Sequence, residues 1–95
     1  MNEIMNLTSN YVIAEIPLPE DWQNKAIVDL NVRKKYNLTI IFVKRNEEVV
    51  NPAAETTLLP GDVLIVAGEK DTLTQLSFKS AEVLDSVNQL FNDNE

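Results

Sequence analysis

Lys25-Ala-Ile-Val-Asp-Leu-Asn-Val-Arg-Lys-Lys-Tyr-Asn-Leu-Thr-Ile-Ile-Phe-Val-Lys44 is the stretch that decides the fold. Its first half repeats apolar residues at helical spacing, from Ala26 to Tyr36. Its second half, residues 38–43, is an apolar and β-branched run of strand length. The stretch therefore predicts helical structure followed directly by a buried strand.

Two asparagines divide this stretch. Asn31 lies in the middle of the helical part, and asparagine favours caps over helix interiors. We therefore expect two short helices, 26–30 and 32–36, with the Asn31 side chain capping the second. Asn37 tolerates the left-handed conformation that ends many helices, so it is expected to terminate that second helix.

Most of the positive charge of the chain lies in the same region. Six of the eight basic residues fall in residues 25–45, against the single acidic residue Asp29, which gives a local charge of +5 in a chain of net charge −7. These six are Lys25, Arg33, Lys34, Lys35, Lys44 and Arg45. They are either solubilising side chains on an exposed face or a docking site for an anion, formed by Arg33 and the start of the second helix.

The composition indicates one folded domain and excludes several functions. The chain has 95 residues, 44% of them hydrophobic, and a core of that size would gain from dimerisation. It has no histidine and no cysteine, which removes His- or Cys-dependent catalysis, disulfides and thiolate metal sites. A pI near 4.4 argues against nucleic-acid binding. We expect a cytoplasmic protein without membrane insertion, since no apolar run is long enough to span a bilayer and residues 1–6 do not resemble a signal peptide.

Further elements are predicted from local patterns. The strand Tyr11–Ile16 is ended by prolines, and Trp22 is expected to pack onto the core. A turn at Asn46-Glu47 predicts a hairpin between the central strand and 48–51. The remaining expected elements are a strand at 63–67, closed by Gly68, and a helix at 70–76. The fold class is therefore α+β, with a small mixed or antiparallel sheet flanked by short helices.

Both ends of the chain stand apart from this pattern. Residues 1–10 have no strong periodicity and are expected to be a linker. Residues 77–95 are expected to be an additional helix that Ser80 caps. Its apolar stripe packs either on the body of the domain or on a second subunit. The stripe consists of Val83, Leu84, Val87, Leu90 and Phe91.

Several segments, in this order, resemble the RCK C-terminal (TrkA-C) domain over roughly residues 11–76. The more specific of them are Leu30-Asn31-Val32-Arg33 with Tyr36, and Pro60-Gly61-Asp62-Val63-Leu64. Residues 1–10 then look like the end of the linker from the nucleotide-binding N-terminal RCK domain, and 77–95 look like a helical extension.

The resemblance implies a cytosolic regulatory subunit of a Ktr/Trk-type potassium transporter, with the membrane transporter subunit as its partner. It also implies a two-fold homodimer that binds cyclic di-AMP between its subunits. Arg33 would pair with a phosphate, while apolar side chains would lie under the purines and Asn31 would read the adenine edges. The residues to which it assigns this ligand are Ile27, Val28, Asn31, Val32, Arg33, Thr39, Ile40 and Pro52.

The sequence departs from the family at two of these positions. Asn31 stands where many relatives have aspartate, and Thr39 stands where cyclic di-AMP-binding relatives often have asparagine. The alternative is a dimerisation or gating lobe of a transporter or antiporter that responds to another effector, such as a divalent cation bound by carboxylates. With no histidine, no cysteine and no glycine-rich phosphate loop, the chain is not expected to be an enzyme.

Overall fold

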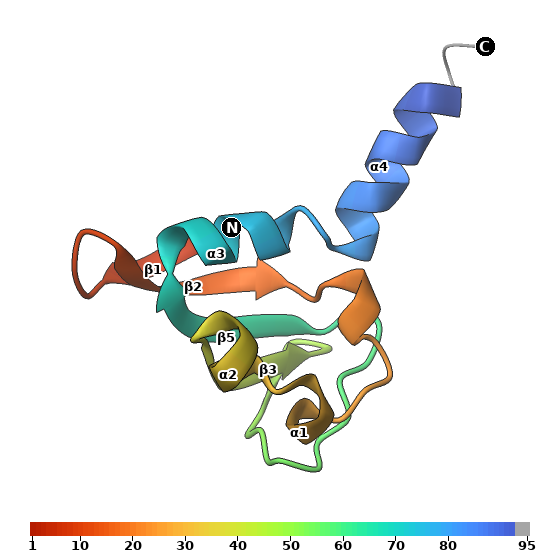
Figure 1. The fold of residues 1–95 in the computed structure, drawn as a ribbon. Coiled ribbons are helices and arrows are strands. Elements are labelled where there is room, and N and C mark those ends of the chain that lie inside the picture. The colour runs from red at the N-terminus through yellow and green to blue at the C-terminus, as the bar shows by residue number, and fades with distance from the viewer. Residues whose placement is uncertain (93–95) are drawn as a thin grey trace.

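The computed structural model describes residues 1–92 and is built on a five-stranded antiparallel sheet in the order β1-β2-β5-β3-β4 (Figure 1). The strands are β1 (Asn2–Asn6), β2 (Tyr11–Pro17), β3 (Thr39–Arg45), β4 (Glu48–Val50) and β5 (Val63–Glu69). The helices are α1 (Ile27–Leu30), α2 (Val32–Tyr36), α3 (Lys70–Ser77), α4 (Ala81–Asn92) and the single 3-10 turn η1 (Glu20–Trp22). The predicted α+β class is confirmed.

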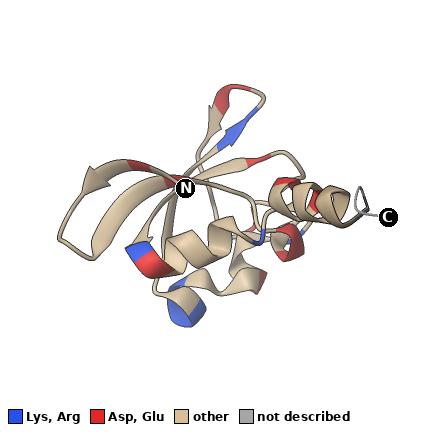
Figure 2. Ribbon diagram, turned by 90° about the horizontal axis from the view of Figure 1, so that it is seen from above, with Lys and Arg blue, Asp and Glu red and all other residues tan. Residues whose placement is uncertain are grey.

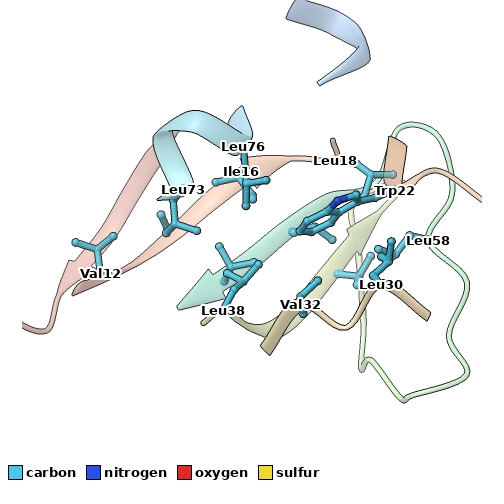
Figure 3. Close-up of a cluster of buried hydrophobic side chains, with 14 residues drawn as sticks. Val12, Ile16, Leu18, Trp22, Leu30, Val32, Leu38, Leu58, Leu73 and Leu76 are labelled. Atoms are coloured by element: carbon cyan, nitrogen blue, oxygen red, sulfur yellow. The ribbon is translucent and has the colours of Figure 1, made fainter. Parts of the chain in front are cut away.

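The hydrophobic core lies on one face of the sheet. Alternate residues of β2 and β5 point to this face and are fully buried, among them Ile16 and Leu64. α3 covers β2 and β5 through Leu73 and Leu76, while the side chains of Leu30, Val32, Leu38 and Leu58 fill the other half of the core (Figure 3). Trp22 is 2% exposed, as expected, and its ring centroid lies 5.6 Å from that of Tyr36.

The helical stretch is divided at Asn31, as the sequence predicts, but the capping expectation is wrong. Asn31 has φ 51° and ψ 46°, a left-handed conformation that ends α1, and its side chain makes no capping hydrogen bond to α2. An N-cap side chain reaches the next amides from an extended backbone. Asn31 has a left-handed backbone conformation, which interrupts the helix and separates α1 from α2, each about one turn long.

Asn37 ends α2 in the left-handed conformation, with φ 52° and ψ 45°, and its N–H bonds back to the carbonyl of Arg33. We expect Asn37→Val to lower the free energy of unfolding by about 1–2 kcal/mol, because a β-branched residue is strained at positive φ. Asn37→Gly should be neutral or slightly stabilising. Urea denaturation tests both, with Asn51→Val as a control at a position without positive φ. Equal losses at positions 37 and 51 would contradict this account.

β3 contains a bulge. Ile40 pairs with Val66 and Phe42 pairs with Ile65, so Ile41 has no partner on β5. The hairpin to β4 is confirmed: the turn residues Asn46 and Glu47 both have positive φ, as its tightest turn type requires. The bulge determines which side chains of the second half of β3 reach the core, since Val43 is buried and Phe42 is 40% exposed.

The N-terminal end of the chain differs from expectation, whereas the C-terminal helix is present as expected. Residues 2–6, which were expected to belong to a linker, form the strand β1 and pair with β2, although every residue of β1 is exposed. The helix of the 77–95 segment is present as α4, and the Ser80 hydroxyl caps it by accepting a hydrogen bond from the Val83 N–H at 3.2 Å. Residues 93–95 of that segment lie outside the described structure.

Candidate functional site

A pocket of about 240 Å³ opens on the outer side of α1 and α2. Its lining is mainly apolar, with one amide and one guanidinium side chain. The lining residues are Ile27, Val28, Asn31, Val32, Arg33 and Ala54. Val28 is 60% exposed, so this apolar wall of the pocket is open to a ligand or a partner.

A loop between β4 and β5 completes this pocket. The first amides of α1 have no partner inside so short a helix, and this loop supplies their acceptors. The Ile27 N–H donates to the Thr56 carbonyl at 3.0 Å, and the Val28 N–H donates to the Ala54 carbonyl at 2.8 Å. These two bonds hold Ala54 beside Val28, so that the loop forms one wall of the pocket.

The basic region is smaller than the sequence indicates. Lys44 pairs with Glu15 at 3.3 Å and Arg45 pairs with Asp62 at 2.8 Å, so both belong to structural ion pairs. In residues 1–92, Arg33, Lys34 and Lys35 take part in none of the ion pairs, and all three are exposed. They form a block of positive charge on α2 (Figure 2), and one of them, Arg33, lines the pocket.

The Arg45–Asp62 pair fixes the loop that leads into β5. Asp62 is 3% exposed, and its carboxylate accepts hydrogen bonds from Arg45 Nε, from Arg45 Nη2 and from the Leu59 N–H, each at 2.8 Å. Burial alone would raise the pKa of Asp62, but these hydrogen bonds and the charge of Arg45 hold that pKa below its usual value. Asp62 is therefore a structural anchor of this loop.

The structure brings together five of the eight residues that the family resemblance assigned to a ligand: Ile27, Val28, Asn31, Val32 and Arg33. The other three lie outside this pocket. Thr39 pairs with Ala67 on the sheet face opposite the core, Ile40 packs against the core, and Pro52 is half-buried in the loop after β4. Ala54, which lines the pocket, was missed because a small residue in a loop gives no periodic signal.

The chain belongs to the TrkA-C domain family, whose model matches residues 11–77. Ktr system potassium uptake protein A of Bacillus subtilis strain 168 is 34% identical over 67 residues, which are 70% of this chain and 30% of that protein. An uncharacterised protein of the same organism, YrvC, is 40% identical over 55 residues, which are 56% of this chain and 33% of that protein. The chain thus spans about a third of the length of these curated relatives.

Solved structures agree with this assignment. The RCK C domain of the potassium transport protein KtrA, solved in complex with cyclic diadenosine monophosphate, has a TM-score of 0.64 and 31% identity, and the match covers 70% of this chain and 80% of that one. The GsuK RCK domain has a TM-score of 0.67 and 29% identity, covering 83% of this chain and 18% of that one. Across residues 1–92, no helix has the length and apolar character needed to cross a bilayer.

Proposed function

We propose that this chain is a regulatory domain of a potassium transport system, that it binds cyclic di-AMP at the α1–α2 pocket of a two-fold dimer, and that it acts in the cytoplasm on a membrane transporter subunit. The observation that carries the proposal is the pocket itself, in which an exposed apolar wall at Val28 lies beside the guanidinium of Arg33. A KtrA domain of the same family, 31% identical, was solved with this nucleotide, which supports the choice of ligand.

The size of the pocket favours a shared ligand. Small-molecule pockets usually enclose about 300–1,000 Å³, and a single chain here offers about 240 Å³. Cyclic di-AMP is two-fold symmetric and carries two purines. A two-fold dimer presents each pocket twice, so each chain would receive one adenine. Ile27, Val28 and Val32 provide the apolar surface on which a purine packs.

The charge of the pocket suits the two phosphates. Among the residues that the structure describes, Arg33 is the only charged one that lines it, and a guanidinium binds phosphate oxygens through two parallel hydrogen bonds. Lys34 and Lys35 raise the positive potential on the same helix without lining the pocket. Arg33, Lys34 and Lys35 would thus all attract an anionic ligand, but only Arg33 would contact it.

A divalent-cation effector has less support from the described residues. Within residues 1–92, no three acidic side chains lie close enough together to hold a metal ion. Asp62, one of the carboxylates that such a site would need, is occupied by Arg45 and the Leu59 amide. Calorimetric titration with calcium provides the direct comparison, and we expect no heat of binding.

Isothermal titration of cyclic di-AMP into the purified chain tests the proposed function. We expect a stoichiometry of one ligand per two chains, and a melting temperature that rises with ligand concentration because only the folded dimer binds. Adenosine monophosphate at the same concentration is the matched control, since it offers one purine and no symmetry. An unchanged melting temperature at millimolar cyclic di-AMP would overturn the proposal.

A further inference from the structure

The sheet face opposite the core is apolar and uncovered. An antiparallel sheet that faces water usually alternates apolar and polar residues, with the polar set outward. Here the outward residues include Met5 (55% exposed), Phe42 (40% exposed) and Val49 (64% exposed), together with the half-buried Ile13 and Ile65. We call this surface the open face. Its central charged residues, Glu15 and Lys44, neutralise each other in an ion pair.

α4 presents a second apolar surface without a partner. It stands away from the rest of the molecule in Figure 1, and of its stripe only Val83 and Leu84, near its start, are half-buried. Val87 is 41%, Leu90 67% and Phe91 72% exposed. The sequence from Ser86 to Asn92 contains no charged residue. An amphipathic helix of this kind normally buries its stripe in a second layer of structure.

The helix starts beside the open face. Glu82, in the first turn of α4, lines a groove of about 370 Å³ together with Glu15 and Val63, whose side chains lie on the open face. From this edge α4 runs outward rather than back across its own sheet. The first turn of α4 therefore lies at the edge of the open face, but the exposed stripe further along the helix does not contact that face.

We propose that two copies of this chain exchange α4, so that the α4 stripe of each copy packs on the open face of the other. The apolar area that this exchange can bury favours it over pairing of α4 with α4. The exposed part of each of the six apolar side chains named above is roughly 100 Å², less than the about 150–250 Å² of a fully buried aromatic residue. Complete burial of all six would therefore remove at most about 1,200 Å² from water over both copies. That reaches the range of specific interfaces, about 1,200–2,000 Å². An α4–α4 pair would bury only half as much and is too short for a coiled coil.

Charge and symmetry are compatible with the exchange. The outer part of the α4 stripe is uncharged, and the two central charges of the open face, Glu15 and Lys44, are paired with each other, so neither has to be desolvated without a partner. A reciprocal exchange is closed by a two-fold axis, so this interface by itself joins only two copies. The inference does not rest on the proposed nucleotide site, because α1 and α2 cover the other side of the sheet.

Disulfide trapping tests the exchange, because the natural chain has no cysteine. Leu90→Cys chains are mixed with chains carrying Met5→Cys, Phe42→Cys or Val49→Cys and oxidised without nucleotide. We expect a mixed disulfide dimer with at least one of the three, since bonding requires Cα atoms within about 7 Å. Gln89→Cys, on the opposite side of α4, is the matched control and should give none.

Two results would overturn the exchange. Predominant Leu90→Cys homodimers would show that α4 pairs with α4. An intrachain disulfide at monomer mass, in a chain that carries both Leu90→Cys and the sheet cysteine, would show that α4 folds onto its own open face. Both measurements are made without nucleotide, so their failure would leave the proposed function untouched.

Sedimentation provides an independent measurement. The natural chain should form dimers without nucleotide, and Leu90→Glu with Phe91→Glu should raise the dimer Kd at least tenfold. Gln89→Glu adds charge to the polar side of α4 and should leave Kd unchanged. Far-ultraviolet circular dichroism shows whether each variant remains folded. A natural chain that is monomeric at 100 µM, or equal effects at positions 89 and 90, would contradict the proposal.

Discussion

Asp62→Ala is expected to lower the free energy of unfolding by about 3 kcal/mol, the largest stability effect that we predict for a single side chain. Removal of one partner of a buried ion pair costs about 3–5 kcal/mol because the other charge stays unpaired. The lower end applies here, since the Arg45 side chain is 29% exposed and water can solvate it. The Leu59 N–H also loses its acceptor. Urea denaturation followed by the fluorescence of Trp22, the single tryptophan, measures this loss.

Glu15→Ala is the matched control for this prediction. It removes the Lys44–Glu15 pair, whose side chains are 37% and 31% exposed, and should cost less than about 1 kcal/mol. The double variant Arg45→Ala/Asp62→Ala should lose less than the sum of the two single variants, because no unpaired charge is left. If Asp62→Ala and Glu15→Ala cost the same small amount, Asp62 does not anchor the loop.

The same pair gives a pH dependence with a defined sign. The pKa of Asp62 is lower in the folded chain than its ordinary value, so its ionised form stabilises the fold. This contribution is complete above the unfolded pKa of about 3.9 and is lost as the pH falls through the lower folded pKa. The difference in unfolding free energy between the natural chain and Asp62→Ala should therefore shrink below about pH 4. A difference that is constant from pH 7 to pH 3 would contradict this.

Arg33→Ala is expected to weaken cyclic di-AMP binding by at least 100-fold. In the proposed dimer each ligand phosphate faces one Arg33, and the loss of a charge-assisted bond to a desolvated partner costs about 2–5 kcal/mol, while about 2.8 kcal/mol corresponds to 100-fold. Arg33→Lys should retain part of the affinity, because a lysine supplies the charge without the paired hydrogen bonds. Isothermal titration of each variant measures the change in Kd.

Lys34→Ala controls for charge alone. Lys34 neighbours Arg33 on α2 but does not line the pocket, so its removal should weaken binding less than fivefold. Its effect should also disappear at high salt, whereas that of Arg33→Ala should persist. Similar losses for both variants would indicate that the nucleotide responds to the potential of α2 rather than to a contact with Arg33.

The sequence predicted those features that depend on residue preferences within a short segment. The division of α1 from α2 at Asn31, the termination of α2 at Asn37 and the burial of Trp22 follow from residue preferences that act within one or two turns. β1 could not be predicted, because all five of its residues are exposed and show no alternation. It forms only because the edge of β2 accepts it.

The site was predictable to the same limit. Five of the expected ligand residues lie on α1 and α2 and share one pocket because adjacent helical turns keep them together. Ala54 reaches that pocket through tertiary hydrogen bonds from α1, which no pattern in the sequence indicates. Likewise, the pairing of Arg45 with Asp62, 17 residues away, distinguishes a structural arginine from Arg33, which lines the pocket, only after the chain has folded.

The bulge in β3 has a consequence for chain length. Ile41 is the residue of β3 without a partner on β5, so its deletion would leave Thr39, Ile40, Phe42 and Val43 on the faces that they occupy now. A deletion within the regular part of the strand would instead reverse the faces of the residues on one side of it and carry Val43 out of the core. Position 41 is thus the point at which this strand tolerates the loss of one residue during evolution.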